Sequence, residues 1–125
     1  MTRLLSELAL LQEAGQLSAS EELLENSLSS LYGLPVEHDD QFREWFPLIE
    51  NFEPDPNKTA ALGFLAELIS RFGDVKLHEN NKVAAENLYR IALLVYNIQQ
   101  QADRAFSLGR EEAVKRLSQK INELL

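Results

Sequence analysis

Acidic side chains at helical spacing are the first residues of this chain whose arrangement could do chemistry. Glu21, Glu22 and Glu25 form the pattern EExxE, and Glu37 and Asp40 form the pattern ExxD. Carboxylates three or four residues apart lie on one face of a helix, and two such sets on facing helices can hold Mg²⁺ against a phosphate chain. The two patterns therefore define a candidate magnesium site.

The spacing of these carboxylates resembles that of the all-α nucleotide pyrophosphohydrolases of the MazG and dimeric dUTPase class. The resemblance implies Mg²⁺-dependent hydrolysis that needs Glu22, Glu25 and Asp40. However, the second pair follows Pro35 and precedes a predicted helix, which Asp39 or Asp40 can cap. We interpret the carboxylates as solvated helix faces and caps, and we keep the hydrolase as an alternative.

Arg71 and His78 form a second candidate. Histidine can act as a general acid or base near neutral pH, and arginine can hold a phosphate. With six residues between them, the pair resembles the RxxxxxxH signature of the HEPN-type helical ribonucleases, which implies RNA cleavage at a dimer interface. Phe72 stands where that family has a polar residue, and Gly73 is expected to end the helix before His78. RNA cleavage is the second alternative.

Other reactive patterns are weaker. His38 lies beside Glu37 and Asp39, but sequence neighbours point in different directions and do not converge on a metal. No serine stands in a nucleophile elbow, and no glycine-rich loop follows a strand. We therefore predict no catalytic residues, no metal ligands and no cofactor.

Composition favours a small cytoplasmic protein. The chain has 125 residues and no cysteine, which fits one domain over residues 1–125 and suits a reducing compartment. Glu7 and Glu13 interrupt the apolar run at the N-terminus, and no apolar run approaches the roughly 20 residues that cross a bilayer. We expect no membrane partner.

Charge is unevenly distributed along the chain. The net charge is −8; residues 1–57 hold twelve carboxylates against two basic residues, and residues 58–125 hold eight against ten. The first part is therefore strongly acidic, at −10, and the second is weakly basic, at +2. This disfavours nucleic acid as a partner, because phosphate binding needs a basic surface. The acidic half either stays solvated or docks a basic protein.

The apolar periodicity predicts an all-α fold of about five helices. A helical hairpin is expected at 2–33, its second helix opened by a capping box at Ser18 and closed by Gly33. Residues 34–58 form an irregular segment with a short helix that Pro47 breaks or kinks. The remaining helices lie within 59–125.

Within 59–125, one helix is expected to end at Gly73, and another begins after a break at Ser107-Leu108-Gly109. Between them lies the longest helical pattern, at about 81–106, capped by Asn80 or Asn81. Its middle is apolar on both faces, which is typical of a buried helix around which the others pack. A second copy of the chain would cover the excess apolar surface simply, so we expect a homodimer. The predicted oligomer interface comprises Leu88, Ile91, Leu94, Val95 and Ile98.

Aromatic residues are concentrated just before this helical half. If the segment packs under the loop, its rings belong to the core; if they are exposed among acidic residues, they form an anchor for a partner. The predicted partner-binding residues are Phe42, Trp45, Phe46, Asp39 and Asp40. The sequence thus predicts a non-catalytic module that binds another protein, as an adaptor, regulator, chaperone or immunity-type protein.

Overall fold

The computed structural model describes residues 6–7, 10, 17–34, 42, 44–51, 59–103 and 107–125. These residues form five α-helices: α2 (Leu17–Tyr32), α3 (Trp45–Glu50), α4 (Thr59–His78), α5 (Lys82–Asp103) and α6 (Leu108–Leu124). The predicted all-α helical bundle is confirmed. Residues 6, 7 and 10 are also helical, within the first helix expected from the sequence.

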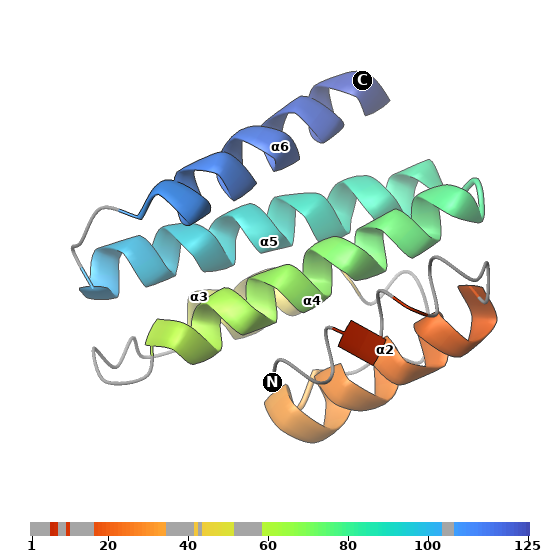
Figure 1. Cartoon of the computed structure of the whole chain (residues 1–125), viewed down its shortest axis with the longest axis horizontal. Helices are drawn as coiled ribbons and strands as arrows, with labels where there is room; N and C mark the ends of the chain where they lie inside the picture. Colours follow the sequence, from red (N-terminus) through yellow and green to blue (C-terminus); the bar gives the residue numbers. More distant parts are fainter. Residues whose placement is uncertain are drawn as a thin grey trace.

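Helices α2, α4, α5 and α6 lie side by side in one layer in which α5 separates α4 from α6, and α3 lies behind α4 and α5 in this view (Figure 1). The pair α4 and α5 forms the most extensive helix interface, α6 packs on the other side of α5, and α3 also packs against α5. The acidic helix α2 packs on α4, at the edge of the layer opposite α6. The helix predicted to be central therefore touches three of the four other described helices.

The core is built around α4 and α5 and receives side chains from every described helix. Six successive core positions of α5 are completely buried: Ala85, Leu88, Tyr89, Ile91, Ala92 and Val95. They share one broad face of the helix. On the opposite face Arg90 and Asn97 are exposed, and Leu93 and Leu94 are partly buried. The prediction that the middle of this helix is buried is therefore confirmed for one face, and the prediction that it is buried all round is wrong.

The predicted end of α2 is confirmed. Gly33 has φ +66°, a left-handed conformation that costs glycine little, and its N–H donates to the carbonyl of Ser29 at 3.0 Å. The N–H of Leu34 reaches back to the carbonyl of Leu28 at 3.3 Å, and the Leu34 side chain is buried. This arrangement satisfies carbonyls at the helix end and packs the following apolar residue on the core. At its other end α2 begins at Leu17, so Ser18 lies inside the helix rather than before it.

Caps mark the beginnings of α5 and α6 where the sequence places them. Asn81 Oδ1 accepts a hydrogen bond from the N–H of Ala84 at 3.2 Å, and the side chain of Ser107 accepts from the N–H of Arg110 at 3.2 Å. Each cap satisfies an amide that has no partner within its helix. The predicted cap at Asn81 is confirmed. The break predicted at Ser107-Leu108-Gly109 is confirmed only at Ser107, because Leu108 and Gly109 belong to α6.

The prediction that Gly73 ends its helix is wrong, since α4 continues to His78. Gly73 is buried against the ring of Tyr89 on α5, and a Cβ atom there would lie 2.6 Å from Tyr89 Cε1. The glycine serves the close approach of two helices, not a left-handed turn. The helix goes on because the next turn is also packed, with Val75 and Lys76 both buried.

Pro47 does not break α3. It is the third residue of that helix, where the backbone N–H has no intrahelical acceptor, so the missing proton costs nothing. The carbonyl of Pro47 accepts from the N–H of Asn51 at 3.2 Å. The helix is preceded by Glu44, while the predicted caps Asp39 and Asp40 lie outside the described residues.

Candidate functional site

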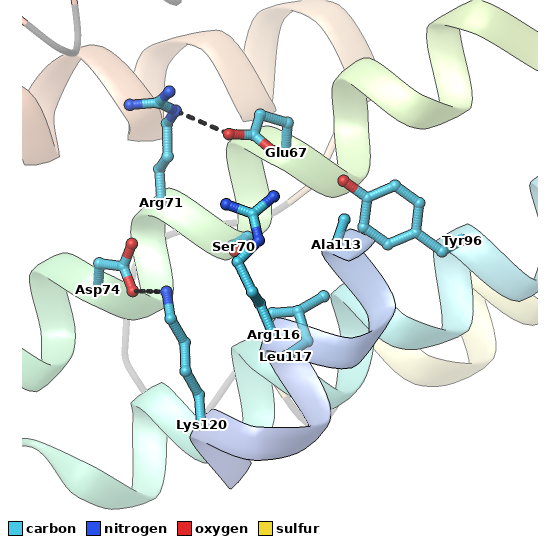
Figure 2. A pocket seen from close by; sticks show the side chains of 9 residues that line it. All are labelled: Glu67, Ser70, Arg71, Asp74, Tyr96, Ala113, Arg116, Leu117 and Lys120. Atoms are coloured by element: carbon cyan, nitrogen blue, oxygen red, sulfur yellow. Dashed lines mark hydrogen bonds and ion pairs between the residues drawn. The ribbon is translucent and has the colours of Figure 1, made fainter. Parts of the chain in front are cut away.

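A polar cleft of about 180 Å³ lies where α4, α5 and α6 meet (Figure 2). The α4 residues lining it are three or four positions apart and so share one helix face, as do those of α6. Tyr96 of α5 closes one side. The lining residues are Glu67, Ser70, Arg71, Asp74, Tyr96, Ala113, Arg116, Leu117 and Lys120.

Asp74 organises one end of the cleft. Its Oδ1 atom accepts hydrogen bonds from Lys120 Nζ at 2.8 Å and from the hydroxyl of Tyr89 at 2.6 Å. The Lys120 ammonium also lies 5.3 Å from the centre of the Tyr89 ring, within cation–π range. Burial raises the pKa of Tyr89, and so do the hydrogen bond to Asp74 and its negative charge. Tyr89 therefore remains a neutral donor that fixes the carboxylate.

A second ion pair lies at the other end. Arg71 Nε donates to Glu67 Oε1 at 3.2 Å, one turn away on α4. The hydroxyl of Tyr96 points toward Glu67 (Figure 2). The pKa of Tyr96 is raised to about 12, mainly by burial and also by the charge of Glu67, against an opposing effect of Arg116. At neutral pH this hydroxyl is a protonated hydrogen-bond donor.

Arg116 reaches from α6 toward α4 between these two ion pairs (Figure 2). Its side chain is exposed, and among the described residues no carboxylate lies within the 4.0 Å of an ion pair with it. The lining contains three cations and two carboxylates, so the cleft carries a surplus of one positive charge. Chemically, the arrangement can hold an anion.

The acidic pattern at the start of α2 contributes to stability instead. Glu21 Oε1 lies 2.7 Å from Nζ of Lys76, which is only 5% exposed and also lies 3.4 Å from Glu79 Oε2. A buried ammonium needs such partners, so Glu21 ties α2 to α4. Glu22 is exposed and Glu25 is half-buried.

The second acidic pattern, Glu37 and Asp40, lies outside the described residues, as does His38. Within the part of the chain that the structure describes, no three His, Asp or Glu side chains gather closely enough to hold a metal ion. The described residues thus add nothing to the proposed magnesium site.

Arg71 and His78 share the continuous helix α4. Seven residues correspond to almost two turns, so the two side chains leave the helix on nearly the same face. Arg71 lines the polar cleft, and His78 is exposed in the last turn. The expectation that the helix ends between them is wrong.

The aromatic segment supplies core residues. Phe42 and Trp45 are buried, with 1% and 0% of their surface exposed, and their rings meet edge to face at 5.0 Å. Phe42 also meets Phe72 of α4 at 5.4 Å, while Phe46 is partly buried against the core. Phe42 and Trp45 are therefore core residues, and these two rings do not form an exposed anchor. Asp39 and Asp40 lie outside the described residues.

The predicted oligomer residues are mostly covered within one chain. Leu88, Ile91 and Val95 are completely buried, whereas Leu94 and Ile98 are partly buried. The neighbouring helices α3, α4 and α6 pack against α5. The argument for a second copy therefore now depends on Leu94 and Ile98.

Sequence reasoning did not bring Asp74, Tyr96 and Lys120 together. In the sequence, Lys120 and Arg116 have the pattern of basic residues near a helix C-terminus, which suit the helix dipole. The available signal was their four-residue spacing, which places two cations on one face of α6. Their partner Asp74 is 46 residues away, so only the fold reveals the cleft.

Comparisons with protein-family models, with curated proteins and with solved structures find no match. None of the described helices is both long and apolar enough to cross a membrane. Function must therefore be argued from the residues of this chain.

Proposed function

We propose that this protein is a non-catalytic interaction module whose acidic N-terminal half docks a basic surface of another protein. One observation carries the proposal: residues 17–51 hold eight carboxylates and a single basic residue, Arg43. A surface that serves only solubility usually mixes both signs of charge. A surface dominated by one sign instead steers a partner of opposite charge.

The exposed side chains of these two helices fit this role. Glu22 is exposed on α2, at the edge of the helix layer. Around α3, Glu44 and Glu50 are exposed, with Leu48 between them at 44% exposure. An accessible apolar side chain flanked by charges resembles the centre and rim of a protein interface. With Phe42 and Trp45 buried, Leu48 replaces these rings as the apolar contact.

Two further parts of the proposal concern the state of the protein. A homodimer would use the partly buried Leu94 and Ile98 of α5. A cytoplasmic location agrees with the absence of cysteine.

The experiment is a tagged purification at low salt from the native host, with mass spectrometry of whatever co-purifies in near-equal amount. The test variant combines Glu22→Gln, Glu44→Gln and Glu50→Gln, all at exposed positions. The control removes the same charge from exposed positions of α6: Glu111→Gln, Glu112→Gln and Glu123→Gln. We expect a basic partner that is retained by the control and lost by the test variant.

Two results would contradict this function. Equal retention of the partner by both variants would remove the acidic half from the interface. Mg²⁺-dependent hydrolysis of a nucleoside triphosphate that disappears in Glu22→Gln would instead establish the pyrophosphohydrolase alternative.

One observation favours a second function, metal-independent RNA cleavage: the continuous helix α4 places Arg71 and His78 on nearly one face. Cleavage that survives a chelator and is lost in both Arg71→Ala and His78→Ala would support it. Intact RNA after incubation with the wild-type protein would exclude it.

A further inference from the structure

We propose that the cleft between α4, α5 and α6 binds the phosphate group of a small molecule through Arg116, Lys120 and Ser70. This site is separate from the acidic docking surface, because its residues come from the second half of the chain.

The first argument is an uncompensated charge. Arg116 and Lys120 are four residues apart on α6 and repel each other. Asp74 compensates Lys120 at 2.8 Å, but no described carboxylate lies within ion-pair distance of Arg116. Glu112, one turn before Arg116 on the same helix, also stays beyond that distance. An anion in the cleft would relieve the repulsion and neutralise the surplus positive charge.

The second argument is the direction of the donors. The guanidinium of Arg116 and the ammonium of Lys120 come from α6, and the hydroxyl of Ser70 comes from α4. Lys120 has three N–H donors and gives one to Asp74. Tyr96 closes one side of the cleft, but its single O–H is directed at Glu67. Donors arriving from two helices suit the acceptors of a tetrahedral oxyanion. A planar carboxylate would need only one bidentate arginine.

The third argument is size. The cleft volume of about 180 Å³ is below the roughly 300–1,000 Å³ of sites that enclose a drug-sized ligand. The lining is mainly charged and polar, which leaves little apolar surface for a ring. The cleft therefore fits a single phosphate group, and the rest of the molecule would remain outside.

The test uses inorganic phosphate as the probe, with amide chemical shifts of the labelled full-length protein followed by NMR. Acetate at equal ionic strength is the carboxylate probe. The test variant is Arg116→Gln, and the matched control is Lys115→Gln, an exposed neighbour on the outer face of α6 that does not line the cleft. Both variants lose one positive charge.

We expect saturable shifts at Ser70, Tyr96 and residues 116–120, with weaker binding of acetate. Arg116→Gln should weaken phosphate binding about tenfold or more, as loss of a charged hydrogen bond does, and Lys115→Gln should leave it nearly unchanged. Shifts located elsewhere in the wild-type protein, equal binding of acetate, or equal affinity of the two variants would overturn the proposal. The wild-type shifts decide the question even if a variant does not fold.

Discussion

The substitution Gly73→Ala tests how α4 and α5 approach each other. An added Cβ would lie 2.6 Å from Tyr89 Cε1 and 2.8 Å from Cδ1, both closer than real Cβ atoms come to a neighbour. The ring has little freedom to move away, because it is completely buried and its hydroxyl donates to Asp74 at 2.6 Å. The methyl group must therefore strain the helix pair or displace the hydroxyl.

The magnitude follows from three opposing terms. Alanine in place of glycine in a helix interior stabilises by about 1 kcal/mol. Overpacking of a core costs about 1–3 kcal/mol, and loss of a hydrogen bond to a charged acceptor costs about 1.5–3 kcal/mol. Either cost alone leaves a net loss of about 0–2 kcal/mol, and both together leave about 1.5–5 kcal/mol. We expect an intermediate net loss of about 1–3 kcal/mol in the free energy of unfolding, which lowers Tm by roughly 4–12 °C in a chain of this length.

The assay is urea unfolding followed by far-UV circular dichroism, with Gly63→Ala as the control. Gly63 is also inside α4, but its Cβ would meet Nε2 of Gln99 at 2.8 Å, the end of a flexible side chain that donates to the carbonyl of Thr59. That side chain can rotate away, so the propensity gain and the lost hydrogen bond nearly cancel, to within about 1 kcal/mol. If Gly73→Ala were as stable as Gly63→Ala, the close contact with Tyr89 would not constrain the fold.

Three further predictions address the core, the partner residues and pH. Leu88→Asp should unfold the chain, because it buries an unpaired carboxylate. Leu94→Asp, at a partly buried position, should keep the circular dichroism spectrum and should convert a dimer to a monomer, as measured by light scattering. An unchanged mass would show that Leu94 makes no dimer contact. Trp45 is the only tryptophan and is completely buried, so its fluorescence emission should be blue-shifted and only weakly quenched by iodide. Strong quenching would show that the side chain is exposed and can act as a surface anchor. Because burial raises the pKa of Tyr96 from 10.0 in the unfolded chain to about 12 in the folded one, its stabilisation is full below pH 10 and is lost as pH rises toward 12. Between pH 9 and 11.5 the Tm of the wild type should fall more than that of Tyr96→Phe. If the Tm of the two proteins fell equally with pH, the raised pKa of Tyr96 would be contradicted.

Features set by local chemistry were predictable from the sequence. The end of α2 needs only a glycine that adopts positive φ and an apolar residue after it, and Gly33 and Leu34 provide both. The caps at Asn81 and Ser107 likewise depend on residues within one turn. The apolar stripe of α5 predicted the face that is buried, because periodicity reports which side of a helix is covered. The apolar residues Leu93 and Leu94 of the opposite side are only partly buried.

Features set by distant contacts were not predictable in this way. Gly73 has the local signature of a helix end, but the ring of Tyr89, sixteen residues later, explains why glycine stands there, and the burial of Val75 and Lys76 explains why the helix continues. Similarly, Lys76 looks like a solvated residue of a connector, but Glu21 at a separation of 55 residues allows it to be buried. The rings of Phe42 and Trp45 could be placed only once Phe72 of α4 was known to meet Phe42.

The fold also restricts how two proposed properties can coexist. In a two-fold symmetric dimer each surface patch meets its own copy, so acidic α2 and α3 surfaces would repel each other across such an interface. A homodimer must therefore use another surface, and the partly buried Leu94 and Ile98 of α5 offer one. Salt distinguishes the two contacts, because screening weakens attraction between opposite charges but hardly affects apolar packing. Raising ionic strength should release a basic partner from the acidic half and leave an α5-mediated dimer intact; a dimer that strengthened with salt would show that like charges face each other in it.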